Sequence, residues 1–457
     1  MQTSDFTEVS YQPRIIDSQL KRVLSISPAV LIEGPRGCGK TMSAINQAES
    51  VVFVDDPNTQ KLLEVDPYYL LDGAQPHLID EWQLYPQVWN QVRRNADAGE
   101  GFGQFILTGS AVPADDITRH TGAGRVVRVR ERTMTWSEKT ALRGLLAASD
   151  PAADNGNEVQ PVAEAEQSVA AARALASAPQ KVSLRALFNG DAVSTDSRTY
   201  SYGQVLELLL TSGFPRQVGL APHEAQEALL GYAEEIVRTD LGRIADLRVA
   251  PVLIEQVIVS LARLSAAEAR IATVYRDALA VAPAVTEATV ARIVNLLERL
   301  FVVEKVAAWA PRLRSRGRLR TSPKYHLMDP AFAAAVLRAG REALLADPET
   351  AGFLFESAVV HDLSVMAESL GGRVCHYRDS NGHEIDAVIE LNDGRWAAVE
   401  VKLGAGQIEA GARSLARAVA QIEHARPPAF MAVVTGTGMS YTMPEGIHTF
   451  PLAALEM

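Results

Sequence analysis

The chain has 457 residues, 47% of them hydrophobic and 22% charged, an ordinary balance for globular domains that excludes a wholly disordered or collagen-like protein. Two cysteines, Cys38 and Cys375, are too few for a disulfide framework and indicate a reducing, cytoplasmic environment. The net charge of −11 argues against indiscriminate attraction of nucleic acid, so any such site has to be a local basic patch.

The first 140 residues predict a mostly parallel sheet with crossover helices. The N-terminus has no short apolar core of the kind that marks a secretory signal. No apolar run approaches the roughly 18 residues that span a bilayer, so we expect no membrane partner. Short apolar runs alternate with helix-like stretches, as in α/β domains. The expected strands are Ala29–Glu33, Val51–Asp55, His77–Asp80, Phe105–Thr108 and Val126–Arg130.

A phosphate-binding loop (P-loop) is predicted between the first strand and the helix after it. Residues 34–41 read GPRGCGKT, which fits G-x-x-x-x-G-K-[ST]. Glycines let backbone N–H groups turn toward phosphate oxygens, and the N-terminus of the following helix favours negative charge. Lys40 is expected to bridge the β- and γ-phosphates of ATP, and the Thr41 hydroxyl to bind Mg²⁺. The expected nucleotide contacts are Gly34, Pro35, Arg36, Gly37, Cys38, Gly39, Lys40, Thr41 and Met42.

The strand expected at residues 77–80 ends in two acids, Asp80 and Glu81. Asp80 is predicted to hold Mg²⁺, directly or through water, and Glu81 to polarise the attacking water. Strands often end in acids at a solvated edge, and this is the alternative. A P-loop upstream favours the catalytic interpretation.

Polar residues near the next two strands are further catalytic candidates. Thr108 and Ser110 stand at the tip of one strand, where a side chain can sense the γ-phosphate or orient water; ordinary turn chemistry is the alternative. Arg119 and Arg125 flank the turn HTGAGR, and either can act as an arginine finger, in cis or from a neighbouring subunit. A structural or solvent-facing ion pair is their alternative. The sequence leaves the oligomeric state open, and a homo-oligomer is one possibility.

In this order, IEGPRGCGKT, LIDEW, ILTGS and GRVVRV resemble a large prokaryotic family of AAA-like ATPases. The resemblance implies Mg²⁺-dependent ATP binding and hydrolysis, a helical middle region and a C-terminal domain of unknown function. It covers nearly the whole chain except residues 145–180. That stretch is rich in Ala, Pro and acids and lacks aromatic residues, so it has too little apolar surface for a core.

The middle of the chain, from residue 201 to about 341, predicts helices and a basic hairpin. A helix at 286–300 is followed by a strand, a basic turn and another strand, an order that fits a winged helix-turn-helix, as the resemblance also implies. The hairpin can clamp DNA phosphates. Alternatively, it folds back on an acidic surface or serves as a nucleotide-sensing lid. The basic residues are Arg312, Arg314, Arg316, Arg318, Arg320 and Lys324.

The C-terminal part predicts a second small α/β domain. A helix at 352–370 precedes strands near 374–377, 385–391, 396–402 and 429–435. Asp386 lies at the start of one strand, and Glu400 and Lys402 share a face of the next, because side chains alternate with a period of two. Two carboxylates can hold Mg²⁺ or Mn²⁺, and the lysine can position water.

This D…ExK arrangement resembles the core of PD-(D/E)xK nucleases. The resemblance implies that Glu356, on the preceding helix, completes a metal site with Asp386 and Glu400, and that Lys402 is the catalytic lysine. No proline precedes Asp386. The alternative is an ion-paired, catalytically silent scaffold.

The expected fold class is therefore α/β, with a P-loop sheet, a helical and winged-helix middle, and a restriction-endonuclease-like end. We expect an ATPase domain at 1–140, an insertion or linker at 141–200, a helical region at 201–345 with the winged helix at about 268–330, and a nuclease-like domain at 346–457. The predicted function is ATP hydrolysis coupled to DNA binding. The alternatives are a nucleotide-switched DNA- or protein-binding module with slow hydrolysis, and an ATP-coupled nuclease.

Overall fold

The computed structural model describes residues 11–99, 101–109, 123–148, 180–240, 249–311, 322–424 and 426–457. They form two compact units. The first lies within residues 1–133, 235–251 and 291–303, and the second within 134–234, 252–290 and 304–457. None of the helices in the described ranges combines the length and apolarity that crossing a bilayer requires.

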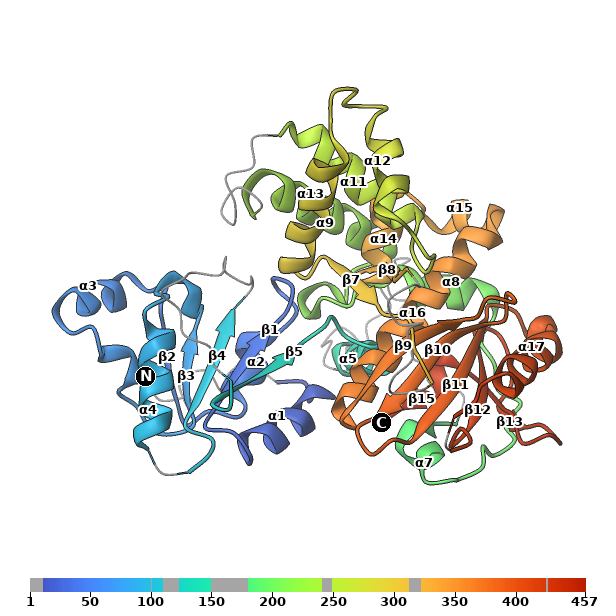
Figure 1. The fold of residues 1–457 in the computed structure, drawn as a ribbon, viewed down its shortest axis with the longest axis horizontal. Coiled ribbons are helices and arrows are strands. Elements are labelled where there is room, and N and C mark those ends of the chain that lie inside the picture. Colours follow the sequence, from blue (N-terminus) through green and yellow to red (C-terminus); the bar gives the residue numbers. More distant parts are fainter. Residues whose placement is uncertain are drawn as a thin grey trace, which may run out of the picture. The chain divides into compact units, whose positions relative to one another are not determined.

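A five-stranded parallel sheet organises the first unit, in the order β2–β3–β4–β1–β5 (Figure 1). The strands are β1 Ala29–Glu33, β2 Ser50–Phe53, β3 His77–Asp80, β4 Phe105–Gly109 and β5 Val126–Arg130, which confirms the predicted sheet. The chain passes from β1 to β2 across two intervening strands. Such a switch in strand order leaves a crevice at the carboxyl ends of the strands, where ligands bind in open α/β sheets.

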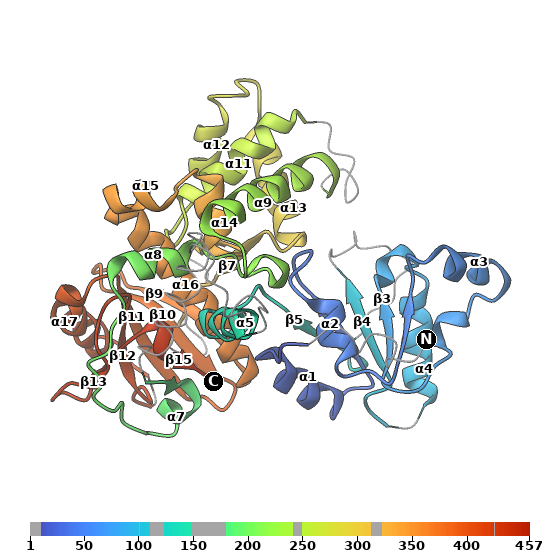
Figure 2. The same ribbon diagram turned by 180° about the vertical axis from the view of Figure 1, so that it is seen from behind.

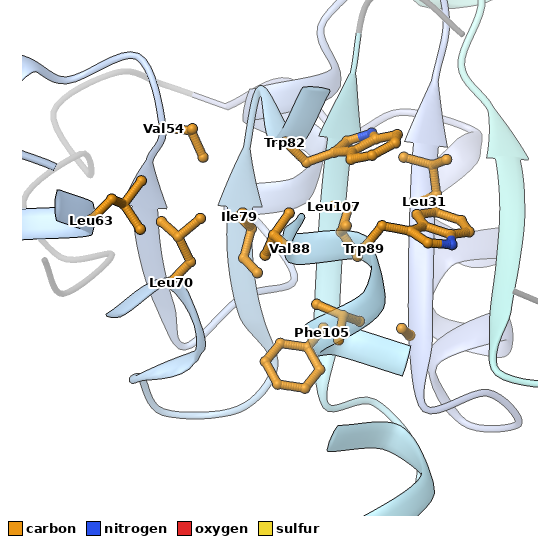
Figure 3. Close-up of a cluster of buried hydrophobic side chains, with 12 residues drawn as sticks. Leu31, Val54, Leu63, Leu70, Ile79, Trp82, Val88, Trp89, Phe105 and Leu107 are labelled. Atoms are coloured by element: carbon orange, nitrogen blue, oxygen red, sulfur yellow. The ribbon is translucent and has the colours of Figure 1, made fainter. Parts of the chain in front are cut away.

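The sheet of the first unit is covered on both faces. Helices α1 (Ile16–Leu24) and α2 (Lys40–Ile45) pack with Val30, Ile32 and Ile106. Helices α3 (Pro57–Val65) and α4 (Val88–Ala98) belong to the other face, where Figure 3 shows Trp82 and Trp89 beside Leu31 and Leu107. Because alternate strand residues enter the two cores, apolar residues follow one another without a polar interruption.

A six-stranded mixed sheet organises the C-terminal part of the second unit, in the order β13–β14–β12–β11–β10–β9. Its strands are β9 Gly372–Arg378, β10 Glu384–Leu391, β11 Trp396–Lys402, β12 Met431–Thr435, β13 Tyr441–Thr442 and β14 His448–Pro451. Helices α16 (Pro348–Ser369) and α17 (Ile408–Ala420) pack on it, and α17 lies along β11 and β12 in both views (Figures 1 and 2). The expected α/β fold class is confirmed.

The middle of the chain is mainly helical, as predicted. Its elements are α8 Tyr202–Leu210, α9 Pro222–Glu235, the π-helical turn η6 Ile236–Asp240, α11 Pro251–Arg263, α12 Ile271–Ala278, α13 Glu287–Arg299, β7 Val303–Val306, β8 Lys324–Leu327, α14 Pro330–Val336 and α15 Arg341–Ala346. Strands β7 and β8 pair, and single bridges join Ser265 and Glu268 to β8. This order agrees with the predicted winged helix, which stays a prediction.

An insertion or linker was predicted at residues 141–200, and the structure shows ordered elements at both ends of that stretch. Helix α5 (Trp136–Ala148) extends into the stretch, and residues 149–179 lie outside the described ranges. Beyond them, β6 (Val182–Ser183) pairs with β15 (Leu455–Glu456), and α7 (Leu184–Phe188) follows. Leu184, Leu187 and Phe188 are buried, so this segment belongs to the C-terminal core. The apolar residues return just after the acid-rich part of the stretch.

Candidate functional site

The P-loop joins the carboxyl end of β1 to the start of α2. A Cβ atom on Gly34 would lie 2.0 Å from the carbonyl oxygen of Glu131, so only glycine fits there. Gly37 and Gly39 have φ angles of 76° and 123°, which favour glycine. The path of the loop is therefore set by these glycines. Pro35 and Arg36 lie within the loop and Met42 on the first turn of α2.

Two of the residues predicted to hold Mg²⁺ are in contact beside the loop. Thr41 Oγ1 donates a hydrogen bond to Asp80 Oδ1 at 2.8 Å, and Thr108 Oγ1 donates to the same oxygen. Burial raises the pKa of Asp80, and the hydrogen bonds from Thr108 and Thr41 oppose that rise. A buried carboxylate next to a P-loop hydroxyl suits a divalent cation, which would favour the charged form. These residues therefore fit a nucleotide-bound Mg²⁺.

Lys40 folds back over the P-loop. Its Nζ donates hydrogen bonds to the carbonyl oxygens of Gly34, at 3.0 Å, and Pro35, at 2.8 Å. The ammonium group is thereby held over the loop whose amides are expected to receive phosphates. Cys38 lies in the same loop, and burial raises the pKa of its thiol to about 11. It is a packing residue and has little thiolate character at neutral pH.

Glu81 directly follows β3 with a left-handed backbone, at φ 55°. Such a conformation costs a non-glycine residue on the order of 1 kcal/mol, so the surroundings must hold it. Its backbone N–H donates to Thr108 Oγ1 at 3.3 Å, and Gln83 Nε2 donates to its carboxylate. Thr108 therefore contacts both Asp80, the last residue of β3, and Glu81 after it, while Gln83 orients the carboxylate of Glu81. Sequence reasoning missed Gln83, although its place two residues after Glu81 was a signal.

A buried ion pair supports the P-loop, and sequence reasoning missed it. Arg14 and Glu131 lie 3.3 Å apart, with side chains 4% and 1% exposed. Arg14 also donates to the carbonyl oxygens of Cys38 and Arg132, both at 3.1 Å, and Ser43 Oγ donates to the Glu131 carboxylate at 3.0 Å. The pair thus joins the loop, the start of α2 and the segment after β5. No motif marks either residue.

Arg125 lies at the end of the sheet away from the P-loop. It stands directly before Val126, which pairs with Ala29 at the first position of β1. The P-loop follows the last position of β1, roughly 13 Å further along the strand. The guanidinium of Arg125 pairs with Asp97. The prediction of an arginine finger acting in cis is therefore wrong for Arg125, because β5 begins at the opposite edge.

Several predicted residues fall outside the described ranges, and their roles stay predictions. They are Ser110, Arg119, Arg312, Arg314, Arg316, Arg318 and Arg320.

The structure brings the residues of the predicted C-terminal site together. Asp386, on β10, accepts a hydrogen bond from the Val401 backbone N–H of β11 at 2.8 Å. Glu400 and Lys402 form an ion pair of 2.7 Å on β11. Glu356, on α16, is linked to this cluster by a further cation that lies close to both Glu356 and Asp386. A cavity of about 460 Å³ is lined in part by Glu356 and Lys402.

That further cation is Lys324, which the sequence placed among the DNA-binding residues. Its side chain is 3% exposed, and its Nζ lies 2.7 Å from Glu356, 3.0 Å from Glu384 and 3.9 Å from Asp386. This placement corrects the prediction, because β8 turns Lys324 inward and away from solvent. Glu384 was also missed. It stands two residues before Asp386, so the period of two along a strand was a signal.

The electrostatics of the C-terminal cluster reflect an excess of carboxylates. Burial, followed by repulsion from Asp386, raises the pKa of Glu356 to about 8 and that of Glu400 to about 7. Burial alone would lower the pKa of Lys324, but the surrounding carboxylates outweigh it and raise that pKa. The lysine is therefore an ammonium at every ordinary pH. Within the described ranges, no group of three or more His, Cys, Asp or Glu residues is arranged to hold a metal ion.

Comparisons with known proteins divide the chain into three matched segments. Residues 27–140 match an AAA domain family. Residues 203–343 and 351–455 match two domains of unknown function, DUF8612 and DUF4143. Among solved structures, the chain is similar to the Walker-type ATPase PABY2304 of Pyrococcus abyssi, at 14% identity and a TM-score of 0.37, with 71% of this chain and 96% of that chain covered. A comparison with curated proteins gives no match.

The AAA match agrees with the P-loop and with the order of the parallel sheet. At this coarse level, residues 27–140 are similar to an AAA domain, and this similarity supports ATP binding and hydrolysis by the N-terminal part of the chain.

Proposed function

We propose that the chain is a Mg²⁺-dependent ATPase that uses the P-loop site of its first unit. The observation that carries the proposal is the contact between Thr41 Oγ1 and Asp80 Oδ1, 2.8 Å apart at the carboxyl end of the sheet. Bound Mg²⁺ would neutralise the charge of the β- and γ-phosphates. Thr41 and Asp80 are the residues that would hold it.

The protein's own amides and side chains bind the phosphates, align the attacking water and accept its proton. The amides of the P-loop and the Lys40 ammonium bind the phosphates, so Lys40 exchanges its carbonyl partners for phosphate oxygens. The Glu81 carboxylate aligns a water for attack on the γ-phosphate and accepts its proton. Thr108 keeps Asp80 and Glu81 in register through one hydroxyl.

Two substitutions test this proposal. Lys40→Ala is expected to abolish ATP binding or turnover, whereas Glu81→Gln keeps binding and slows hydrolysis by a large factor. Glu64→Gln, an exposed change of the same type on α3, is the matched control. Phosphate release is measured at saturating ATP and Mg²⁺. Unaltered turnover in Glu81→Gln shows that the assignment of the base is wrong.

A nucleotide-switched binding module with slow hydrolysis is a second candidate. The contact that favours it is the hydrogen bond from Gln83 to the Glu81 carboxylate, since a carboxylate engaged with a donor is a weaker base. If that contact restrains hydrolysis, Gln83→Ala speeds turnover, and DNA or a protein partner does the same for the intact chain. A slower Gln83→Ala variant identifies Gln83 as a positioning residue for hydrolysis instead.

DNA binding by the hairpin between β7 and β8 is a further part of the proposal. It is supported by five arginines and no acid between residues 312 and 320. We expect DNA affinity to fall steeply with added salt, and Arg314/Arg316/Arg318→Ala to remove most of it. Fluorescence anisotropy with a labelled duplex provides the measurement. Absence of binding even at low salt rejects this role.

The proposed domain organisation places the ATPase domain at 1–140, the helical region at 201–345 and the C-terminal domain at 346–457. Residues 180–200 are assigned to the C-terminal domain, because β6 pairs with β15.

An arginine finger supplied in trans by a homo-oligomer stays part of the proposal for Arg119 and Arg125.

A further inference from the structure

Lys324 has an unusual position for a lysine. It is the first residue of β8 and is bridged to Glu268, so its backbone is fixed within a small sheet. Its side chain is 3% exposed and ends among carboxylates from two elements: Glu356 of α16, and Glu384 and Asp386 of β10. Lysines are almost never fully buried unless they are paired. Two of these carboxylates, those of Glu356 and Asp386, are among the residues that the nuclease resemblance assigns to a metal.

The geometry around Lys324 suits an ammonium group and does not suit a divalent ion. Its Nζ lies 2.7 Å and 3.0 Å from oxygens of Glu356 and Glu384, ordinary lengths for charged hydrogen bonds. Oxygen ligands of Mg²⁺ and Ca²⁺ lie about 2.0 to 2.6 Å from the ion. A metal among the same oxygens would share their space with the Lys324 ammonium. The residues present therefore do not fit a metal while Lys324 stays in place.

The cluster is accessible to ions from solvent, so lack of access would not prevent a metal ion from binding there. Glu356 and Lys402 line the cavity of about 460 Å³, so solvent ions can approach the cluster. The ammonium groups that already lie within the cluster oppose the binding of a metal ion. Four carboxylates, those of Glu356, Glu384, Asp386 and Glu400, face two ammonium groups, those of Lys324 and Lys402.

We propose that the Lys324 ammonium is the resident cation of the C-terminal carboxylate cluster, in the place where a PD-(D/E)xK nuclease would hold a divalent metal. The C-terminal domain is then metal-free, and the cluster secures β8 to the sheet through charge. The chain after β7 is held by other contacts: the Trp309 backbone N–H donates to the His376 carbonyl oxygen of β9, and the centroids of the Trp309 and Trp396 rings lie 4.7 Å apart. The cluster docks the base of the hairpin instead of cutting DNA.

Removal of the lysine provides the test, with Mn²⁺ as the probe. The full chain carrying Asp80→Asn, which weakens the ATP-site metal, is the parent, and free Mn²⁺ is followed by electron paramagnetic resonance. We expect the parent to retain no Mn²⁺ at this cluster. Lys324→Met is expected to gain one Mn²⁺ per chain, and Asp386→Asn to abolish the gain. Lys305→Met, an exposed lysine on β7, is the matched control and gains nothing.

Two results overturn the proposal. One is Mn²⁺ bound by the parent and released by Asp386→Asn, and the other is a folded Lys324→Met variant that gains no ion. If Lys324→Met fails to fold, Lys324→Met/Glu356→Gln takes its place, because it removes one charge of each sign and keeps three carboxylates. This double variant is likewise expected to gain one Mn²⁺, and a folded double variant that gains none overturns the proposal. Because the assay contains no nucleotide, its outcome is independent of the proposed ATPase function.

Discussion

The ion pair between Arg14 and Glu131 gives the sharpest prediction for the ATPase unit. Arg14→Met removes the guanidinium but keeps much of its apolar stem. Glu131, whose side chain is 1% exposed, then loses its contact with the Arg14 guanidinium, and Ser43 still donates to it at 3.0 Å. The Cys38 carbonyl in the P-loop also loses the hydrogen bond from Arg14.

The free-energy cost of each loss can be given. Removing one partner of a buried ion pair costs about 3–5 kcal/mol, since an uncompensated charge stays buried. Arg14→Met/Glu131→Gln removes both charges and is expected to recover most of that loss. The lost contact to the Cys38 carbonyl is worth about 1 kcal/mol. We therefore expect the affinity for ATP to fall about fivefold in the single variant.

Hydrogen exchange of the β1 and β5 amides, read by mass spectrometry, measures the local stability of this sheet. Lys21→Met, an exposed change on α1, is the control and is expected to alter the protection little. The reasoning is refuted if Arg14→Met costs less than about 1 kcal/mol, or if the double variant is as unstable as the single one.

Three further predictions concern the same unit. Thr108→Val removes the hydroxyl that contacts Asp80 and the Glu81 amide, so we expect turnover to fall about 10- to 100-fold and the Mg²⁺ requirement to rise; unchanged Mg²⁺ titrations contradict this. Gly34→Ala is expected to abolish ATP binding, because its Cβ would meet the Glu131 carbonyl oxygen at 2.0 Å, and calorimetry that still detects binding shows that the loop can shift. Burial raises the pKa of the Cys38 thiol to about 11, so only about a thousandth of the side chain is thiolate at pH 8. The rate of its alkylation by iodoacetamide is therefore expected to rise about tenfold per pH unit. Rapid labelling of the folded protein at pH 8, measured by mass spectrometry, argues against that pKa.

The elements of the P-loop sheet follow from local sequence patterns. A short apolar run before GPRGCGKT predicts a strand, and the acids after residues 77–79 predict its neighbour at the catalytic edge. The contact between Thr41 and Asp80 then follows, because the carboxyl ends of parallel strands share one edge. Local patterns are sufficient where each residue is positioned by its own strand or loop.

Contacts between distant segments were not accessible from the sequence. Arg14 and Glu131 are 117 positions apart, and neither belongs to a motif. The cis role of Arg125 failed because its position relative to the P-loop depends on the direction and register of β5. Lys324 was grouped with the arginines by charge alone, and charge clustering does not reveal which side of a strand faces the core.

The central claim is a nucleotide site formed by the P-loop, Thr41 and Asp80. Isothermal titration of the full chain with ATP in the presence of Mg²⁺ tests it most directly. We predict one ATP bound per chain, lost in Lys40→Ala and weakened in Asp80→Asn. Well-folded protein that takes up no ATP, or takes it up equally well after Lys40→Ala, contradicts the account.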